Sequence, residues 1–247
     1  VHQVQDIDIS RFPDELEPLI PDTEILPAPA ASLQSDDGTQ IDLLVVYTEE
    51  ARNAVGGKSA MESKIDLAVA ETNQGYANSG ITQRIRLVHR EEITYNESGF
   101  DWYDALDRLV GTADGYMDTV HALRNTYQAD VVVLIVNNGT YCGISYLMRT
   151  VSPSFADHAF SIVSQYCATG YYSFAHEMGH VMGAHHARAN AGGTTGAYSY
   201  AYGYQEPAGD FRTVMAYANG CLSSCPRINY WSNPDIKYSG KPTGIIY

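Results

Sequence analysis

The string HEMGHVMGAHH, residues 176–186, constrains this chain more than any other feature, and it contains four of the eight histidines. Residues four apart in a helix stand on one face, a single turn from each other, so His176 and His180 can bind the same ion. Neutral imidazole is a good zinc ligand, and a catalytic zinc keeps three protein ligands and one position for water. The spacing therefore predicts a helix that carries two ligands of a zinc site.

The remainder of the string offers a base and a third ligand. Glu177 is one step around the helix from His176, where its carboxylate can reach the water and take its proton. The third ligand is either His185 or His186. Gly183 can adopt a positive φ, so the helix can end there and the chain can turn back toward the metal.

With His186 in the last position, the string matches H-E-x-x-H-x-x-G-x-x-H and resembles the metzincin clan of zinc endopeptidases. The layout is similar to that of bacterial reprolysin-like enzymes, including the peptidyl-Asp endopeptidase group, over about residues 41–245; the segment CPRINYWSNPDIKYSGKPTG, residues 225–244, contributes to this likeness. The resemblance implies an endopeptidase that holds one catalytic Zn²⁺ and hydrolyses internal peptide bonds. His185 then becomes a peripheral or solvent-facing residue.

The resemblance also implies a tight turn with a methionine beneath the ligands, which RTVMAYANG, residues 212–220, can supply. Met215 would form the hydrophobic floor of the site without binding the metal. Tyr217 would either approach the metal or the oxyanion, or be a packed phenol. A substrate would lie extended along an edge strand near Ile144 and Ser145.

A preference for peptidyl-Asp bonds, if it follows from the resemblance, requires a buried cation in the pocket beyond the metal. Three arginines are candidates for this cation: Arg212, Arg227 and Arg188. We expect Arg227 to contribute to substrate binding, although each of the three could equally be an ordinary surface arginine.

From Ile41 onward, segments with strand and helix patterns alternate. The predicted strands are residues 41–48, 81–95, 130–138, 142–148 and 159–167, and the predicted helices are 58–80, 100–128 with a break near Gly111 and Gly115, and 173–183. This alternation predicts an α/β fold with right-handed crossovers and a mostly parallel, twisted sheet. The metzincin resemblance implies an α+β variant with one antiparallel edge strand, an active-site helix and an irregular C-terminal subdomain.

Residues 1–40 read as an acidic, proline-rich leader, with nine acidic residues and only Arg11 as a base. Its prolines favour extended backbone, so we interpret it as a pro-segment remnant or an N-terminal extension. Since the chain begins at Val1, we expect an upstream segment to have been removed. Residues 41–247 would form the catalytic domain, divided into subdomains 41–183 and 184–247.

The four cysteines favour two disulfides in an exported protein, and Cys142–Cys167 with Cys221–Cys225 keeps both loops local, although other pairings stay open. The net charge of −14 argues against nucleic acid or an anionic membrane as a partner. We expect a secreted monomer that acts on proteins or peptides and also contacts its own pro-segment.

Two other hypotheses compete with an active enzyme. One is a latent zymogen whose leader covers the cleft and gives a carboxylate to the metal, for which Asp14 in RFPDELE is the nearest candidate. The other is a zinc-binding interaction module without catalysis. Such a module would be expected to lack the base, whereas Glu177 is present.

Overall fold

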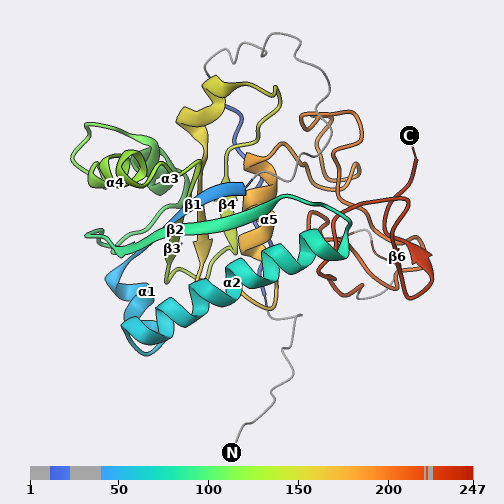
Figure 1. The fold of residues 1–247 in the computed structure, drawn as a ribbon, viewed down its shortest axis with the longest axis horizontal. Helices are drawn as coiled ribbons and strands as arrows, with labels where there is room; N and C mark the ends of the chain where they lie inside the picture. The colour runs from blue at the N-terminus through green and yellow to red at the C-terminus, as the bar shows by residue number, and fades with distance from the viewer. Residues whose placement is uncertain (1–11, 23–39, 220, 222–224, 247) are drawn as a thin grey trace, which may run out of the picture.

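The computed structural model describes residues 12–22, 40–219, 221 and 225–246 (Figure 1). Its centre is a five-stranded sheet with the strand order β2-β1-β3-β5-β4. Four strands run parallel and β4 is antiparallel to β5 at the edge, as predicted. The strands are β1 Gln40–Tyr47, β2 Arg84–Glu92, β3 Val131–Val136, β4 Gly143–Ser145 and β5 Phe160–Ser164.

The three inner strands are apolar on both faces, and this is why the sequence places them in the middle of the sheet. All six residues of β3 and all five of β5 are buried, whereas most of β2 is partly exposed at the other edge. β4 is shorter than predicted, because only three of its residues pair with β5. It is nonetheless the strand that borders the functional residues.

Helices cover the sheet and end close to the predicted positions. The helical elements are α1 Glu49–Ala54, α2 Lys58–Asn78, α3 Trp102–Val110, α4 Thr119–Tyr127, the 3-10 helix Pro153–His158, and α5 Ser173–Val181. The predicted break after α3 is confirmed, since the helix ends at Val110 and Gly111 follows with a non-helical backbone. We did not predict α1 or the 3-10 helix, each of which has only six residues.

The long helix α2 packs on β2 and on α5, while α3 packs on β4 and β5 (Figure 1). Beyond α5 the described chain is mostly irregular and lies to one side of the sheet, where β6 Lys237–Tyr238 and β7 Lys241–Pro242 form a small hairpin. The predicted fold class is confirmed. The division into subdomains at residue 183 stays a prediction.

Of the predicted leader, residues 12–22 and Gln40, the first residue of β1, are described, and residues 1–11 and 23–39 lie outside the described part of the chain. Residues 12–22 run beside β4, to which they are joined by main-chain hydrogen bonds. Both predicted disulfides, Cys142–Cys167 and Cys221–Cys225, are present. None of the helices within the described ranges is both long enough and apolar enough to cross a membrane.

Candidate metal centre

The rings of His176, His180 and His186 converge at one buried point. Their Nε2 atoms are 3.0–3.1 Å from one another. All three side chains are fully buried. In the described part of the chain, these three residues make up the group of side chains that could hold a metal ion.

The opposite ring nitrogens show why this point suits a cation. Nδ1 of His176 is 2.9 Å from the carbonyl oxygen of Val214, and Nδ1 of His180 is 2.8 Å from that of Ala184. Nδ1 of His186 lies 3.2 Å from a Glu17 carboxylate oxygen. Because these oxygens only accept hydrogen bonds, each Nδ1 carries the proton and each Nε2 presents a lone pair.

Burial keeps the imidazoles neutral. It lowers the pKa of His176 to about 3, and it lowers the pKa values of His180 and His186 well below the ordinary value, with neighbouring imidazoles adding to the effect. Three lone pairs that face each other at this distance repel, and protons cannot easily relieve the repulsion in a buried site. A bound metal ion satisfies all three, so the residues present fit one.

The third histidine, His186, reaches the cluster because the chain turns at Gly183, two residues after α5 ends at Val181. Gly183 has a φ of +90°, and a Cβ atom there would lie 2.4 Å from the Cβ of Ala197, so glycine is required for both conformation and space. His185 does not join the cluster, because its Nε2 contacts the Thr194 hydroxyl at 2.5 Å. The structure therefore brings His186, and not His185, to the other two histidines.

Glu177 is fully buried next to β4. One of its carboxylate oxygens accepts a hydrogen bond of 2.6 Å from the Ser145 hydroxyl, and the other has no partner among the described residues. Burial raises the pKa of this carboxyl group well above its ordinary value, against the opposing effect of the Ser145 hydrogen bond. A Cβ atom on Gly143 would lie 2.5 Å from Oε1 of Glu177, so only glycine leaves room for the carboxylate here.

Met215 packs against α5 at Gly179, and its role as the floor of the site stays a prediction. A Cβ atom on Gly179 would lie 2.4 Å from the Met215 sulfur and 2.8 Å from the Trp231 ring, so the missing side chain lets both residues approach α5. Tyr217 packs over the ring of His186, with 4.0 Å between the ring centroids. Its hydroxyl points to the leader and donates hydrogen bonds to the carbonyl oxygens of Glu15 at 2.9 Å and Leu16 at 3.3 Å.

The three candidate arginines lie in different surroundings. The Arg227 side chain is 1% exposed and forms a bidentate ion pair with Glu15 of the leader, at 2.5 and 2.8 Å. Arg212 is also buried, and its Nη2 donates to the Tyr171 hydroxyl at 2.9 Å. Arg188 is exposed and stacks on Tyr202, so it takes no part in this cluster.

The leader contacts β4 through main-chain hydrogen bonds. Leu16 N donates to Gly143 O, and Leu19 N donates to Ser145 O, both at 2.9 Å. The side chain of Ile144 lies in the hydrophobic core, and the Ser145 hydroxyl bonds to Glu177. A role for these two residues in substrate binding stays a prediction, and it would involve the main-chain groups of β4.

Sequence reasoning missed several residues of this region. The acidic residue that pairs with Arg227 is Glu15, which we had not singled out. Asp14, which we had considered as a source of a carboxylate for the metal, is exposed and contributes its main-chain carbonyl to Cys142 N at 3.1 Å. Ser173, which donates to Glu15, and Tyr171, which stacks against Arg227, were also missed. The sequence has no local pattern that would mark any of these three.

Comparison with known proteins identifies the family. A reprolysin-type family model, described as metallo-peptidase family M12, matches residues 37–232. A peptidyl-Asp metalloendopeptidase of Stenotrophomonas maltophilia is 44% identical over 98% of this chain and 58% of its own length. A protein of the same description from Pseudomonas fragi is 40% identical over 70% of this chain and 88% of its own length.

The chain spans about half the length of some other relatives, such as the peptidyl-Asp metalloendopeptidase of Xanthomonas campestris, which is 45% identical over 87% of this chain and 49% of its own length. A solved structure described as a chaperone–substrate complex has a TM-score of 0.60 at 22% identity and covers 83% of this chain and 34% of that one. This structural likeness concerns the fold alone. The family match, the relatives and the three-histidine cluster agree, and the chain belongs to metallo-peptidase family M12.

Proposed function

We propose that this protein is a zinc endopeptidase that hydrolyses internal bonds of proteins and peptides. The observation that carries this proposal is the convergence of three buried, neutral imidazole nitrogens within 3.1 Å, with a buried glutamate next to one of them in the sequence. Membership of a metallopeptidase family supports it.

The donor set favours zinc over other metals. Two imidazoles from α5 and one from the segment after it would provide the three protein ligands of a catalytic zinc site. Zinc is bound preferentially by nitrogen and sulfur donors. Carboxylate-rich sites suit calcium or magnesium, and this cluster contains no carboxylate among its described ligands. When bound, the metal lowers the pKa of a water molecule and polarises the scissile carbonyl group.

Glu177 would act as the general base. Its unpartnered carboxylate oxygen can accept the proton of a water molecule, and its raised pKa suits a group that must then hold that proton and return it to the leaving amine. On the β4 side, Ser145 donates a hydrogen bond to the carboxylate, and Gly143 leaves room for it because it has no side chain. His176, His180 and His186 would be the metal ligands, with Met215 as the floor beneath them.

A peptide substrate would bind along β4, where the leader lies in the structure. The strand offers main-chain oxygens at Gly143 and Ser145, which accept from the leader. Tyr217 donates to a leader carbonyl at 2.9 Å, which supports a role in binding or polarising a substrate carbonyl. Arg227 would bind an acidic side chain, in keeping with the description of the relatives as peptidyl-Asp enzymes.

The two disulfides support an exported enzyme. A second candidate function, a latent zymogen form, is favoured by one observation: residues 14–19 pair with β4, and so occupy the edge that a substrate would need. An inactive zinc-binding module is less well supported, because Glu177 is both present and positioned.

Sequencing the products of a protein digest tests the proposal, since it reports cleavage and specificity together. We expect cuts at peptide bonds next to aspartate.

Glu177→Gln should retain zinc but lower kcat by a factor of about 10³ or more, since the base is lost while the ligands remain. Zinc-loaded Glu177→Gln that digests protein at the wild-type rate would refute the mechanism.

A further inference from the structure

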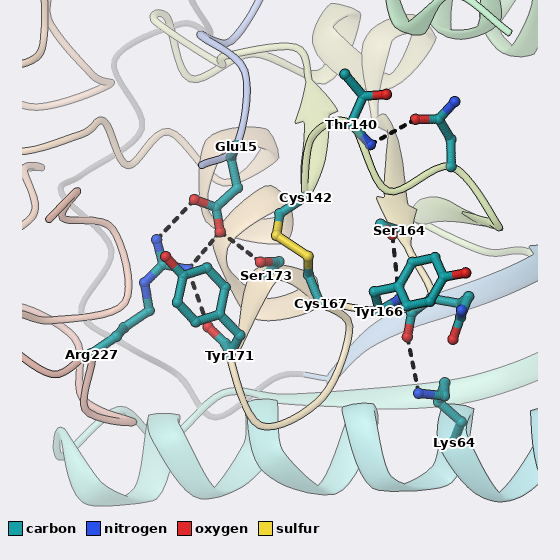
Figure 2. Close-up of a disulfide and its surroundings, with 12 residues drawn as sticks. Glu15, Lys64, Thr140, Cys142, Ser164, Tyr166, Cys167, Tyr171, Ser173 and Arg227 are labelled. Atoms are coloured by element: carbon teal, nitrogen blue, oxygen red, sulfur yellow. Dashed lines mark hydrogen bonds and ion pairs between the residues drawn. A yellow bond between two sulfur atoms is a disulfide. The ribbon is translucent and has the colours of Figure 1, made fainter. Parts of the chain in front are cut away.

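We infer that Glu15 is a built-in stand-in for the acidic side chain of a substrate, and that the leader closes the cleft by filling the arginine pocket rather than by binding the metal. We use the term arginine pocket for Arg227, Arg212, Tyr171 and Ser173. The inference rests on the proposed function and adds to it a means of regulation. Figure 2 shows Glu15 between Arg227 and Ser173, beside the Cys142–Cys167 disulfide.

The contacts of Glu15 are those expected of a recognised carboxylate. Arg227 contacts one carboxylate oxygen with Nη1 at 2.5 Å and the other with Nη2 at 2.8 Å, and the Ser173 hydroxyl donates at 2.6 Å. Neither charged side chain of the pair is more than 1% exposed. A bidentate pair with an added hydroxyl donor is specific for the planar carboxylate group.

The pocket contains more positive charge than Glu15 alone neutralises. Arg212 lies beside Arg227, because Ile228 N donates to Arg212 O at 2.8 Å and so aligns the two segments. The guanidinium of Arg212 bonds to the Tyr171 hydroxyl, and its Nε and Nη1 atoms have no partner among the described residues. Asp14 is near both arginines but is exposed, so solvent screens its charge. Two buried guanidinium groups make the pocket a strong site for a carboxylate.

The pocket belongs to the folded domain and not to the leader. The loop that carries Tyr171 and leads to Ser173 is fastened at Cys167 by the disulfide, and at Gly170, whose N–H donates to the Glu71 carboxylate at 3.0 Å. Lys64 adds a hydrogen bond of 2.9 Å to the carbonyl of Gln165 (Figure 2). Because these contacts do not involve the leader, the pocket can persist when Glu15 leaves it.

The leader also uses the main-chain contacts that an extended peptide would use. It bonds to Gly143 and Ser145 of β4, Leu147 N donates to Leu19 O at 2.8 Å, and Tyr217 donates to the Glu15 carbonyl. The bridge between Leu19 and Tyr146 is parallel, which gives the direction of the leader along β4. The leader and a substrate therefore compete for one strand edge and one pocket.

The Nε2 atoms that converge in the metal cluster take no part in this closure. The leader carboxylate nearest to it, that of Glu17, contacts Nδ1 of His186 at 3.2 Å, on the side of the ring opposite the Nε2 atoms that converge. In the described chain, the group able to hold an ion contains only the three histidines. The carboxylate–guanidinium pair is thus the contact that would hold the leader in place.

The first test is activity of the full, zinc-loaded chain on a peptide with a single aspartate. Glu15→Gln, which keeps the side-chain volume but removes the charge, should raise kcat/KM by on the order of tenfold or more, because the buried pair with Arg227 is broken. Asp22→Asn, which removes a leader charge outside the pocket, is the matched control and should match wild type. Equal rates for Glu15→Gln and wild type would overturn the inference. If no variant cleaves, including Glu15→Gln, the proposed function fails instead.

The second test does not require catalysis, so it tests carboxylate binding by the arginine pocket even if no variant cleaves. Glu15→Ala deletes a CH2COO⁻ group, so acetate should fit the space and raise the thermal unfolding temperature by about 2–4 °C. Acetamide, which has the same shape without the charge, and chloride at equal ionic strength should have no such effect, and Arg227→Met in the Glu15→Ala background should abolish the acetate effect. An acetate effect no larger than that of acetamide or chloride would show that the pocket does not recognise carboxylates.

Discussion

The histidine cluster and the arginine pocket both use α5, which supplies His176 and His180 to the first and Ser173 to the second, but they are built in contrasting ways. Each is buried and each calls for a partner of the opposite kind, a cation for the histidines and an anion for the arginines. The histidines come from eleven consecutive residues, whereas the pocket combines residues 15, 171–173, 212 and 227. A metal site can thus be encoded locally, while a specificity pocket depends on the whole fold.

The two sites differ also in what fills them. The histidine cluster has neutral side chains, and hydrogen bonds at Nδ1 to main-chain oxygens orient two of its rings. The pocket holds permanent charges, and in the structure its anion comes from the chain itself. Breaking the pocket should therefore harm folding more than emptying the metal site does.

The largest effect on stability is expected from Arg227→Met. This change leaves the Glu15 carboxylate buried without its cation, and breaking a buried ion pair costs about 3–5 kcal/mol. Urea unfolding would measure the loss. The double variant Glu15→Gln/Arg227→Met should regain most of it, and a double variant as unstable as the single one would mean that the pair does not act as a unit.

A smaller stability change is expected from zinc itself. After removal of metal with a chelator, Zn²⁺ at about 100 times its dissociation constant should raise the free energy of unfolding by about 2.7 kcal/mol. His180→Asn should lose this response, since a ligand is missing. His185→Asn should keep it, because His185 Nε2 contacts the Thr194 hydroxyl and its Nδ1 accepts from the main-chain N–H of His186, so neither ring nitrogen joins the converging Nε2 atoms. A response lost in both variants would contradict the choice of ligands.

Gly143→Ala should affect activity without loss of metal. The added Cβ would lie 2.5 Å from Oε1 of Glu177 and displace the carboxylate. A misplacement of this size is expected to lower kcat by about 10²-fold. Gly139→Ala is the control, since its Cβ would meet only the half-exposed ring of Tyr166 at 3.3 Å. Bound zinc, measured by atomic absorption, should be the same in both variants and in wild type.

The smallest expected effect is the pH dependence of the Glu15 contribution to stability. Burial by itself would raise the pKa of Glu15, but Arg227 and the hydrogen bonds from Arg227 and Ser173 outweigh it and hold the pKa well below its ordinary value. A lowered folded pKa gives stability that is present above the unfolded pKa of about 4.3 and is lost as the pH falls toward the folded pKa. The difference in free energy of unfolding between wild type and Glu15→Gln should thus be constant near neutral pH and shrink below about pH 4.3. A difference that grows on acidification would reverse the sign and contradict the pairing.

Much of the fold could be predicted because its elements carry their own periodicity. The apolar run of β3 and the spacing of Met61, Ile65 and Ala68 in α2 are visible in sequence, and these residues are buried. The six-residue α1 is too short to show a helical period, which explains why it was missed. β4 was predicted too long, because its length depends on how much of β5 it can pair with.

By itself, the sequence predicted the three histidines that converge, the glutamate beside them and the bend that brings in His186, because the helical repeat and one glycine relate these residues over a few turns. It also pointed to Arg227 as one of three candidates. Only the tertiary structure brought Arg227 and Arg212 together, left Arg188 apart from them and paired Arg227 with Glu15, which is 212 residues away. The physical reason is that a buried charge needs an opposite charge in space, and no local repeat in the chain records where that partner comes from.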